Sequence, residues 1–277
     1  MKFRKCKLSE LGEIVGGATP STKNKFNYGG NISWITPKDL TNLKGRFINR
    51  GERNITKEGF ENSSTKMLPI NSVLFSSRAP IGYIAINNMN EVCTNQGFKS
   101  IIPNDKINYM FLYYLLKFNK DRIESLGSGT TFKEISGAVM KNIVVSIPEN
   151  KNDQLKIAKV LSKIDEKIEL NTHINNNLYE IMKRIFDNWV NNLDNYEESS
   201  LSKIANYING LAMQKYPAMP NEAGLPVLKI KELGQGQCDT NSDRCSSLIK
   251  PEYIISDGTI IFSWSGTLLV DIWCGGK

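Results

Sequence analysis

The clearest periodic pattern in the chain lies near its middle, where apolar residues recur at alternating steps of four and three along residues 151–190. This heptad spacing is typical of a coiled-coil helix. Asparagines interrupt the seam at its middle, where buried asparagines would fix register at a cost in stability. The pattern predicts a long helix that pairs with a partner; the alternative is an amphipathic helix packed on its own domain. The ten seam positions are Ile157, Leu161, Ile164, Ile168, Asn171, Asn175, Leu178, Met182, Ile185 and Trp189.

The residues before this helix alternate between short β-favouring runs and polar loops. The runs are bounded by Gly, Pro and Asn, which favour turns. They lie at residues 31–36, 72–76, 81–87, 98–102 and 143–147, and residues 8–15 suit either a short helix or a strand. One amphipathic helix is expected over residues 108–123. The fold class predicted for residues 1–150 is therefore mixed α/β (α+β).

Two blocks of the first 150 residues return after the helix. Leu8-Ser9 and the segment ISWITPKDL at residues 32–40 return as Leu201-Ser202 and LPVLKIKEL at residues 225–233. The segment VLFSSRAPIG at residues 73–82 returns as IIFSWSGTLL at residues 260–269. So long a period indicates two related domains rather than a solenoid. Residues 191–277 are expected to form an incomplete second copy, whose apolar β-favouring runs would lack part of their packing.

Charge is concentrated in the first domain. Residues 1–150 carry 21 Lys and Arg against 12 Asp and Glu, a net charge of +9, whereas the whole chain carries +7. An excess of this kind favours a polyanionic partner, although lysines also serve as an ordinary solvated surface. The five cysteines include no C-x-x-C pair, and no apolar run follows the basic start. A soluble, cytoplasmic protein with reduced thiols is expected, with no membrane association.

Catalytic signatures are sparse. The only histidine, His173, falls on the predicted helix outside its seam. No phosphate-binding G-x-x-x-x-G-K-[ST] loop occurs. The adjacent Asp165 and Glu166 suit a solvated helix face better than a nuclease carboxylate pair. We therefore expect no catalytic residue and no metal site, while a nuclease or methyltransferase site of unfamiliar form stays open as an alternative.

Five segments of the first 150 residues form an ordered set: LSELGEIVGGATPS at residues 8–21, WITPKDL at 34–40, VLFSSRAPIG at 73–82, TNQGF at 94–98 and GSGTT at 127–131. Together they resemble the specificity subunit of type I restriction-modification systems. The resemblance continues through Ile147-Pro148 and residues 154–168 into the long helix, so it covers essentially the whole chain. It implies a non-catalytic subunit of an endonuclease and adenine methyltransferase complex.

What the resemblance implies is a division of labour among domains and partner subunits. Residues 1–150 would be the first target-recognition domain, residues 151–190 the spacer helix and residues 191–277 a truncated second recognition domain. Each recognition domain would read half of a bipartite site in double-stranded DNA. The helices would set the spacing and dock modification (methyltransferase) subunits. This chain would bind no cofactor, because S-adenosylmethionine, ATP and Mg²⁺ belong on the modification subunits and the restriction (translocase and nuclease) subunit.

Loop residues of the first domain are the candidates for DNA contact. Lysine and arginine can neutralise phosphates, and Arg, Lys, Asn and Gln can pair with base edges in the major groove. Trp34 is expected in the core, and Asn95 and Gln96 as structural residues. The candidates for DNA contact are Lys23, Asn24, Lys25, Lys44, Arg46, Ser76, Ser77, Arg78, Thr130, Thr131 and Lys133.

Two arrangements remain open for the present activity. Without an intramolecular partner for its seam, the helix could pair two copies of the chain into a symmetric DNA reader. Alternatively, the chain is an inactive truncated remnant or a coiled-coil scaffold that binds modification subunits without reading DNA. The sequence does not give the target bases or their spacing.

Overall fold

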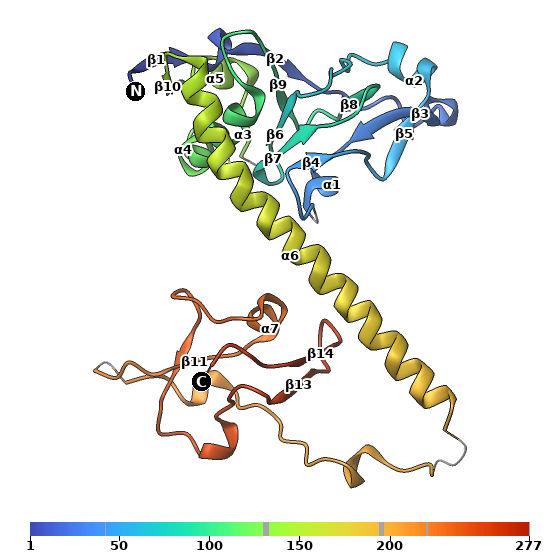
Figure 1. Cartoon of the computed structure of the whole chain (residues 1–277), viewed down its shortest axis with the longest axis vertical. Helices are drawn as coiled ribbons and strands as arrows, with labels where there is room; N and C mark the ends of the chain where they lie inside the picture. The colour runs from blue at the N-terminus through green and yellow to red at the C-terminus, as the bar shows by residue number, and fades with distance from the viewer. Residues whose placement is uncertain (42, 130–132, 194–196, 220, 277) are drawn as a thin grey trace. The chain divides into compact units, whose positions relative to one another are not determined.

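A computed structural model of the chain describes all residues except 42, 130–132, 194–196, 220 and 277. It divides into two units, Met1–Asn191 and Asn192–Lys277 (Figure 1). The last element of the former is the long helix α6 (Lys151–Asn191), and the name first unit is kept for the residues that precede it, 1–150. No helix in the described part of the chain is long and apolar enough to cross a membrane.

Three sheets build the first unit. The largest has five strands in the order β2-β9-β6-β7-β4, the second has the order β5-β3-β8, and β1 pairs with β10 antiparallel. The strands are β1 (Phe3–Lys7), β2 (Gly12–Gly16), β3 (Tyr28–Ile35), β4 (Phe47–Ile48), β5 (Arg53–Ile55), β6 (Val73–Ser77), β7 (Ile81–Asn87), β8 (Val92–Thr94), β9 (Lys99–Pro103) and β10 (Val144–Pro148).

The burial of strand β6 shows that the five-stranded sheet is covered on both faces. All five of its residues are buried. Alternate residues of a strand point to opposite faces, and accordingly Val73 and Phe75 belong to one apolar core while Leu74 belongs to another. The first core is shared with Leu112 and Leu116 of α3. The helices before the long one are α1 (Pro37–Thr41), α2 (Lys57–Glu61), α3 (Tyr109–Phe118), α4 (Lys120–Ser125) and α5 (Gly137–Asn142).

The single helix expected over residues 108–123 is wrong, because the structure has α3 and α4 in its place. Asn119 ends α3 with φ −92° and ψ 7°, and its side-chain amide donates to the Leu115 carbonyl at 2.8 Å. Side chains of asparagine compete in this way for backbone groups and interrupt helices. Residues 8–15 contain both expected forms, a 3-10 helix at Leu8–Glu10 and then β2.

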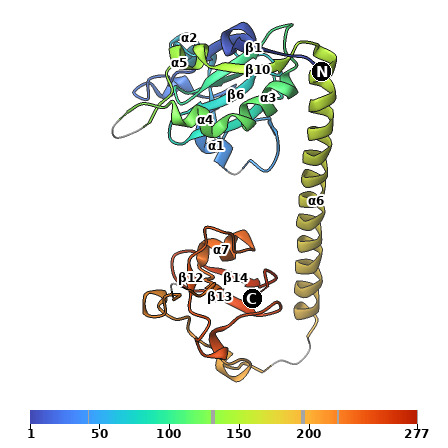
Figure 2. The same ribbon diagram turned by 90° about the vertical axis from the view of Figure 1, so that its left-hand side faces the viewer.

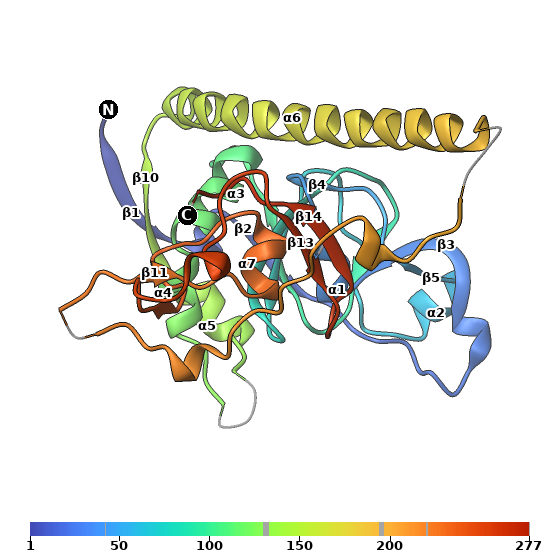
Figure 3. The same ribbon diagram turned by 90° about the horizontal axis from the view of Figure 1, so that it is seen from below.

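The long helix is α6 (Lys151–Asn191), which follows β10 directly (Figures 2 and 3). At about 1.5 Å per residue its 41 residues span roughly 60 Å. Only Gln154 and Ala158 are buried, so the first unit covers the beginning of α6 and leaves its later turns exposed. The mixed α/β class and the long helix are both confirmed.

The second unit repeats elements of the first in the same order. A 3-10 helix at Leu201–Lys203 matches that at Leu8–Glu10, and α7 (Ile230–Gln235) falls where the repeat places α1. Strand β11 (Leu225–Pro226) pairs with β12 (Arg244–Cys245) as β3 pairs with β5. Strand β13 (Ile260–Ser263) forms a hairpin with β14 (Leu269–Ile272), as β6 does with β7. The internal repeat is thus visible in the strand pairing.

Candidate nucleic-acid interface and spacer helix

The start of α6 is fixed to the first unit by one buried glutamine. Gln154 is 1% exposed, and its side-chain oxygen accepts from the backbone N–H of Asn108 at 3.0 Å. Its amide nitrogen donates to the carbonyls of Lys106 and Pro148, both at 3.2 Å. The buried amide thus has partners on both sides, which removes the penalty of burying it. These bonds join the start of α6 to the segment that precedes α3.

About four turns further along, at Glu169, a buried arginine holds the helix. Arg46 is 4% exposed, and its Nε and one terminal nitrogen donate to the two carboxylate oxygens of Glu169, each at 3.1 Å. The backbone N–H of Arg46 also donates to Glu169, at 3.2 Å, and a second guanidinium nitrogen reaches the Ser162 carbonyl at 3.4 Å. Paired bonds of this geometry are the strong and directional form of an ion pair.

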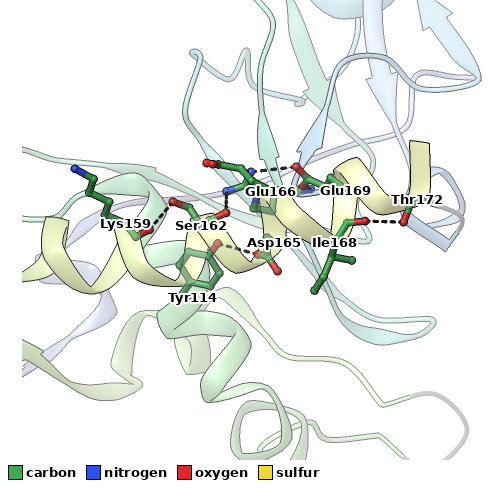
Figure 4. A network of polar contacts seen from close by, with 9 residues as sticks. Tyr114, Lys159, Ser162, Asp165, Glu166, Ile168, Glu169 and Thr172 are labelled. Carbon is green, nitrogen blue, oxygen red and sulfur yellow. Dashed lines mark hydrogen bonds and ion pairs between the residues drawn. The ribbon is translucent and has the colours of Figure 1, made fainter. Parts of the chain in front are cut away.

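A second polar contact lies beside the arginine. Figure 4 shows Tyr114 of α3 pointing toward Asp165 of α6, and its hydroxyl donates to the carboxylate at 2.8 Å. Burial, and then this hydrogen bond, raise the pKa of Tyr114 above its usual range, so the phenol stays a donor. Burial alone would raise the pKa of Glu169, but the hydrogen bonds from Arg46 outweigh it and lower that pKa. Glu169 therefore faces the first unit as a charged acceptor.

The stripe of α6 that faces the first unit differs from the predicted seam. Ile157 and Leu161 do pack partly buried against the first core. The remaining eight seam positions are exposed, among them Ile164 at 55%, Leu178 at 57% and Ile185 at 65%. Asp165 and Glu169, which contact the first unit, each follow a seam position by one residue, or about 100° around the helix. From Ile164 onward the helix accordingly has a polar face held by the first unit and an apolar face without a partner among the described residues of that unit.

Three predicted DNA contacts are corrected, because their side chains are buried. Arg46 is committed to α6, as described above. Ser76 and Ser77 are both 0% exposed. The Ser76 hydroxyl donates to the Pro80 carbonyl at 2.8 Å, and that of Ser77 donates to the Gly97 carbonyl at 3.2 Å. Their polarity suggested an exposed loop, but they end a central strand whose turn they stabilise.

The other candidates are spread over several parts of the surface. Lys23, Lys25, Lys44 and Lys133 are exposed. Asn24 is half-buried and its side chain accepts from the Phe26 N–H, which caps a 3-10 helix at Lys25–Asn27. Thr130 and Thr131 lie outside the described residues. Trp34, expected in the core, is 4% exposed and donates its ring N–H to the Ala18 carbonyl at 3.0 Å. DNA contact by the exposed candidates stays a prediction.

Arg78 lies in a cavity of about 500 Å³ that sequence reasoning did not anticipate. Its guanidinium is 3.6 Å from the Glu134 carboxylate, which also pairs with Lys99 at 3.3 Å. An isolated β-bridge between Arg78 and Glu134 brings these distant segments together. No sequence signal reports such a bridge. The cavity is lined by Thr36, Pro37, Lys38, Arg78, Ala79, Asn95, Gly97 and Glu134.

Metal-binding chemistry finds no support among the described residues. No group of three or more His, Cys, Asp or Glu side chains there is arranged to hold a metal ion. His173 is exposed on α6. The described surface instead carries lysine and asparagine side chains on loops around the five-stranded sheet, together with one long helix.

This combination agrees with the family comparison. Residues 2–180 match the model of the "Type I restriction modification DNA specificity domain". The chain belongs to this family. The match spans the first unit and most of α6, which are the parts whose geometry is described above.

Curated relatives carry the same description. The chain is 36% identical to the type I restriction enzyme MjaIX specificity subunit of Methanocaldococcus jannaschii, over 95% of this chain and 66% of that protein. It is 31% identical to the EcoR124I/EcoR124II specificity subunit of Escherichia coli, over 57% of this chain and 40% of that protein. The chain thus spans less than two thirds of the length of the relatives it matches.

A solved structure shares the fold. A chain from a study of complex assembly in a type I R-M system superposes with a TM-score of 0.50 and 20% identity, over 66% of this chain and 43% of that one. At this identity the match supports the arrangement of strands and helix and nothing about bound partners.

Arg46→Met tests whether the buried ion pair stabilises the first unit. Removing the cation leaves Glu169 without its bidentate partner, so the free energy of unfolding should fall by about 2–3 kcal/mol. Urea unfolding followed by circular dichroism measures this loss. As a matched control, Lys38→Met breaks an exposed pair with Glu52 and should cost less than about 0.5 kcal/mol. Equal losses in the two variants would contradict a special role for Arg46.

The lowered pKa of Glu169 predicts how this stabilisation depends on pH. A carboxylate with a depressed pKa stabilises the fold above its unfolded pKa, about 4.3, and loses that contribution as pH falls through the folded pKa. The stability gap between the natural chain and Glu169→Gln should therefore be constant above about pH 5 and shrink below about pH 4. Urea midpoints of both proteins at pH 7 and pH 3.5 measure it. A gap that does not change with pH would refute the assignment.

Proposed function

We propose that the chain is a DNA sequence-specificity subunit of a type I restriction-modification complex. The observation that carries this proposal is the family match over residues 2–180. The excess of 21 Lys and Arg over 12 Asp and Glu in residues 1–150 supports it, because phosphate neutralisation supplies much of the affinity of DNA-binding proteins. On this proposal the first unit reads one half of a bipartite site.

Arg78 is the side chain best suited to read a base. It is 34% exposed at the cavity it lines, and Glu134 limits its rotamers. A positioned guanidinium can donate two hydrogen bonds to O6 and N7 of guanine in the major groove. Lys23, Lys25 and Lys133 would contact phosphates, which position the protein without reading sequence.

The exposed face of α6 would pair with a second helix and dock modification subunits. Apolar residues exposed along a helix commonly mark a site of association. The modification subunits would bring S-adenosylmethionine, and the restriction subunit ATP and Mg²⁺, while this chain supplies no catalytic group. We place the complex in the cytoplasm.

The exposed seam also favours a second candidate. A helix that captures modification subunits would need no DNA contact from the rest of the chain, so a scaffold is the alternative. In the second unit β13 and β14 expose most of their apolar residues, for example Ile260 at 70% and Val270 at 61%. This unit is the weaker candidate for DNA reading.

Methylome sequencing decides between the two functions. The chain is expressed with its neighbouring modification subunit in a host whose DNA lacks methylation, and methylated adenines are mapped. A bipartite motif is the expected result. If the two halves of the motif are inverted copies of each other, two first units act in one complex. If the halves differ, the first unit reads one of them and a second recognition domain reads the other. If both proteins are soluble and associated but no methylation appears, the scaffold candidate is favoured.

Pairing of two copies through α6 is tested separately. The double variant Leu178→Glu with Met182→Glu places two charges on the seam. It should convert a dimer into a monomer, because the apolar area that these side chains bury between the two helices would be lost. Light scattering after size exclusion measures the mass. The control, Lys159→Glu, changes charge at an exposed position on the side of α6 opposite the seam and should leave the mass unchanged. A natural chain that is monomeric at every concentration refutes pairing.

A further inference from the structure

A second cavity, of about 440 Å³, lies where α6 leaves the first unit. Its walls come from the segment after α1, from the start of β7, from α3 and α4, and from the middle turns of α6. Three lysines line it: Lys44, Lys117 and Lys120. None of them forms an ion pair with any residue that the structure describes.

Two of these lysines are held in position by their surroundings. The Lys117 ammonium lies 5.4 Å from the centroid of the Tyr113 ring, within range of a cation–π contact. The Lys120 stem crosses Gly82, where an added Cβ would lie 2.7 Å from Lys120 Cε. Gly82 has a φ of +93°, a conformation that favours glycine. The side chains are therefore partly ordered before any ligand arrives.

The charges around the cavity do not balance. Its lining carries four cations, the three lysines and Arg46, against the two carboxylates of Asp165 and Glu169, a difference of two. Glu169 is occupied by Arg46, and Asp165 accepts from Tyr114. Neither carboxylate pairs with a lysine of the cavity. The uncompensated positive charge suits an anionic ligand, and ammonium groups bind phosphates as point charges.

This cavity and the one that contains Arg78 are neighbours along the same two segments. Thr36, Pro37 and Lys38 line the Arg78 cavity, and Leu40, Thr41 and residues 43–46 line the lysine cavity, so the two cavities lie at the two ends of α1. Likewise Arg78 and Ala79 line the first, and Gly82 to Ile84 line the second. A ligand that enters one cavity and is extended enough to pass α1 reaches the other.

We propose that Lys44, Lys117 and Lys120 bind the phosphodiester backbone of the DNA strand beside the half-site that the first unit reads. The inference rests on the proposed function and adds a site to it. Duplex DNA is an extended polyanion, which fits two adjacent cationic cavities better than a compact anion does. The contact is made to phosphates, so it raises affinity for every sequence and carries no base preference.

Salt titration of DNA binding tests the site. Binding of the full chain, with its modification subunit, is measured for two duplexes, one that carries the motif found by methylome sequencing and one of unrelated sequence. The salt concentration is varied between about 50 and 300 mM. For Lys117→Gln with Lys120→Gln, the slope of log K against log salt should become shallower by about 1.8, since each phosphate contact contributes about 0.9. Affinity for both duplexes should fall by the same factor. Lys117→Arg with Lys120→Arg should keep the natural slope.

The control double variant is Lys106→Gln with Lys141→Gln, which removes the same charge from exposed positions outside both cavities. It should leave the slope close to the natural value. An unchanged slope in the cavity variant overturns the inference, as does an equal change in the control. Weaker association with the modification subunit at an unchanged slope would assign the cavity to an acidic protein surface and also overturns it. If the natural chain does not prefer its motif, the proposed function fails, while the slope on the unrelated duplex still decides the cavity.

Discussion

The buried guanidinium of Arg46 is the constraint on which the arrangement of the first unit depends. A charge with 4% exposure is costly unless a partner compensates it, and that partner is Glu169, 123 residues further along the chain. The ion pair therefore fixes one rotation of α6 about its axis. Gln154, about four turns before Glu169, fixes the same rotation through backbone carbonyls. Two directional contacts on one face determine which face of the helix stays free.

The polar character of this contact leaves most of the apolar stripe of α6 free. Only the first two seam positions, Ile157 and Leu161, pack against the core of the first unit. Beyond them Asp165 and Glu169 make the contact, and these residues lie one position beyond seam residues. Apolar contact has little directional preference, whereas bidentate hydrogen bonds do. A rigid attachment and an unoccupied apolar face are thus compatible on the same rod.

The sequence predicted features that have local or periodic signatures and failed where distant partners decide. The heptad pattern predicts the long helix, and the β-favouring run at residues 81–87 predicts β7 over the same residues. Asn119 broke an expected helix through a side-chain bond that composition does not report. Residue type alone does not reveal burial, so the polarity of Arg46 and Ser76 predicts exposed DNA contacts where the structure has buried side chains. The Arg78 cavity depends on a bridge to Glu134, which no spacing rule predicts.

The two copies of the repeat show that the burial of a strand depends on the elements packed beside it. In the first unit β6 lies between β7 and β9, and Val73 and Phe75 are 0% exposed. In the second unit β13 pairs with β14 alone within the described part of the chain, and the matching Ile260 and Phe262 are 70% and 49% exposed. The same apolar pattern produces a core in one case and an open hairpin in the other. The pattern specifies the strand, but burial and the stability that follows from it require the elements that cover both faces.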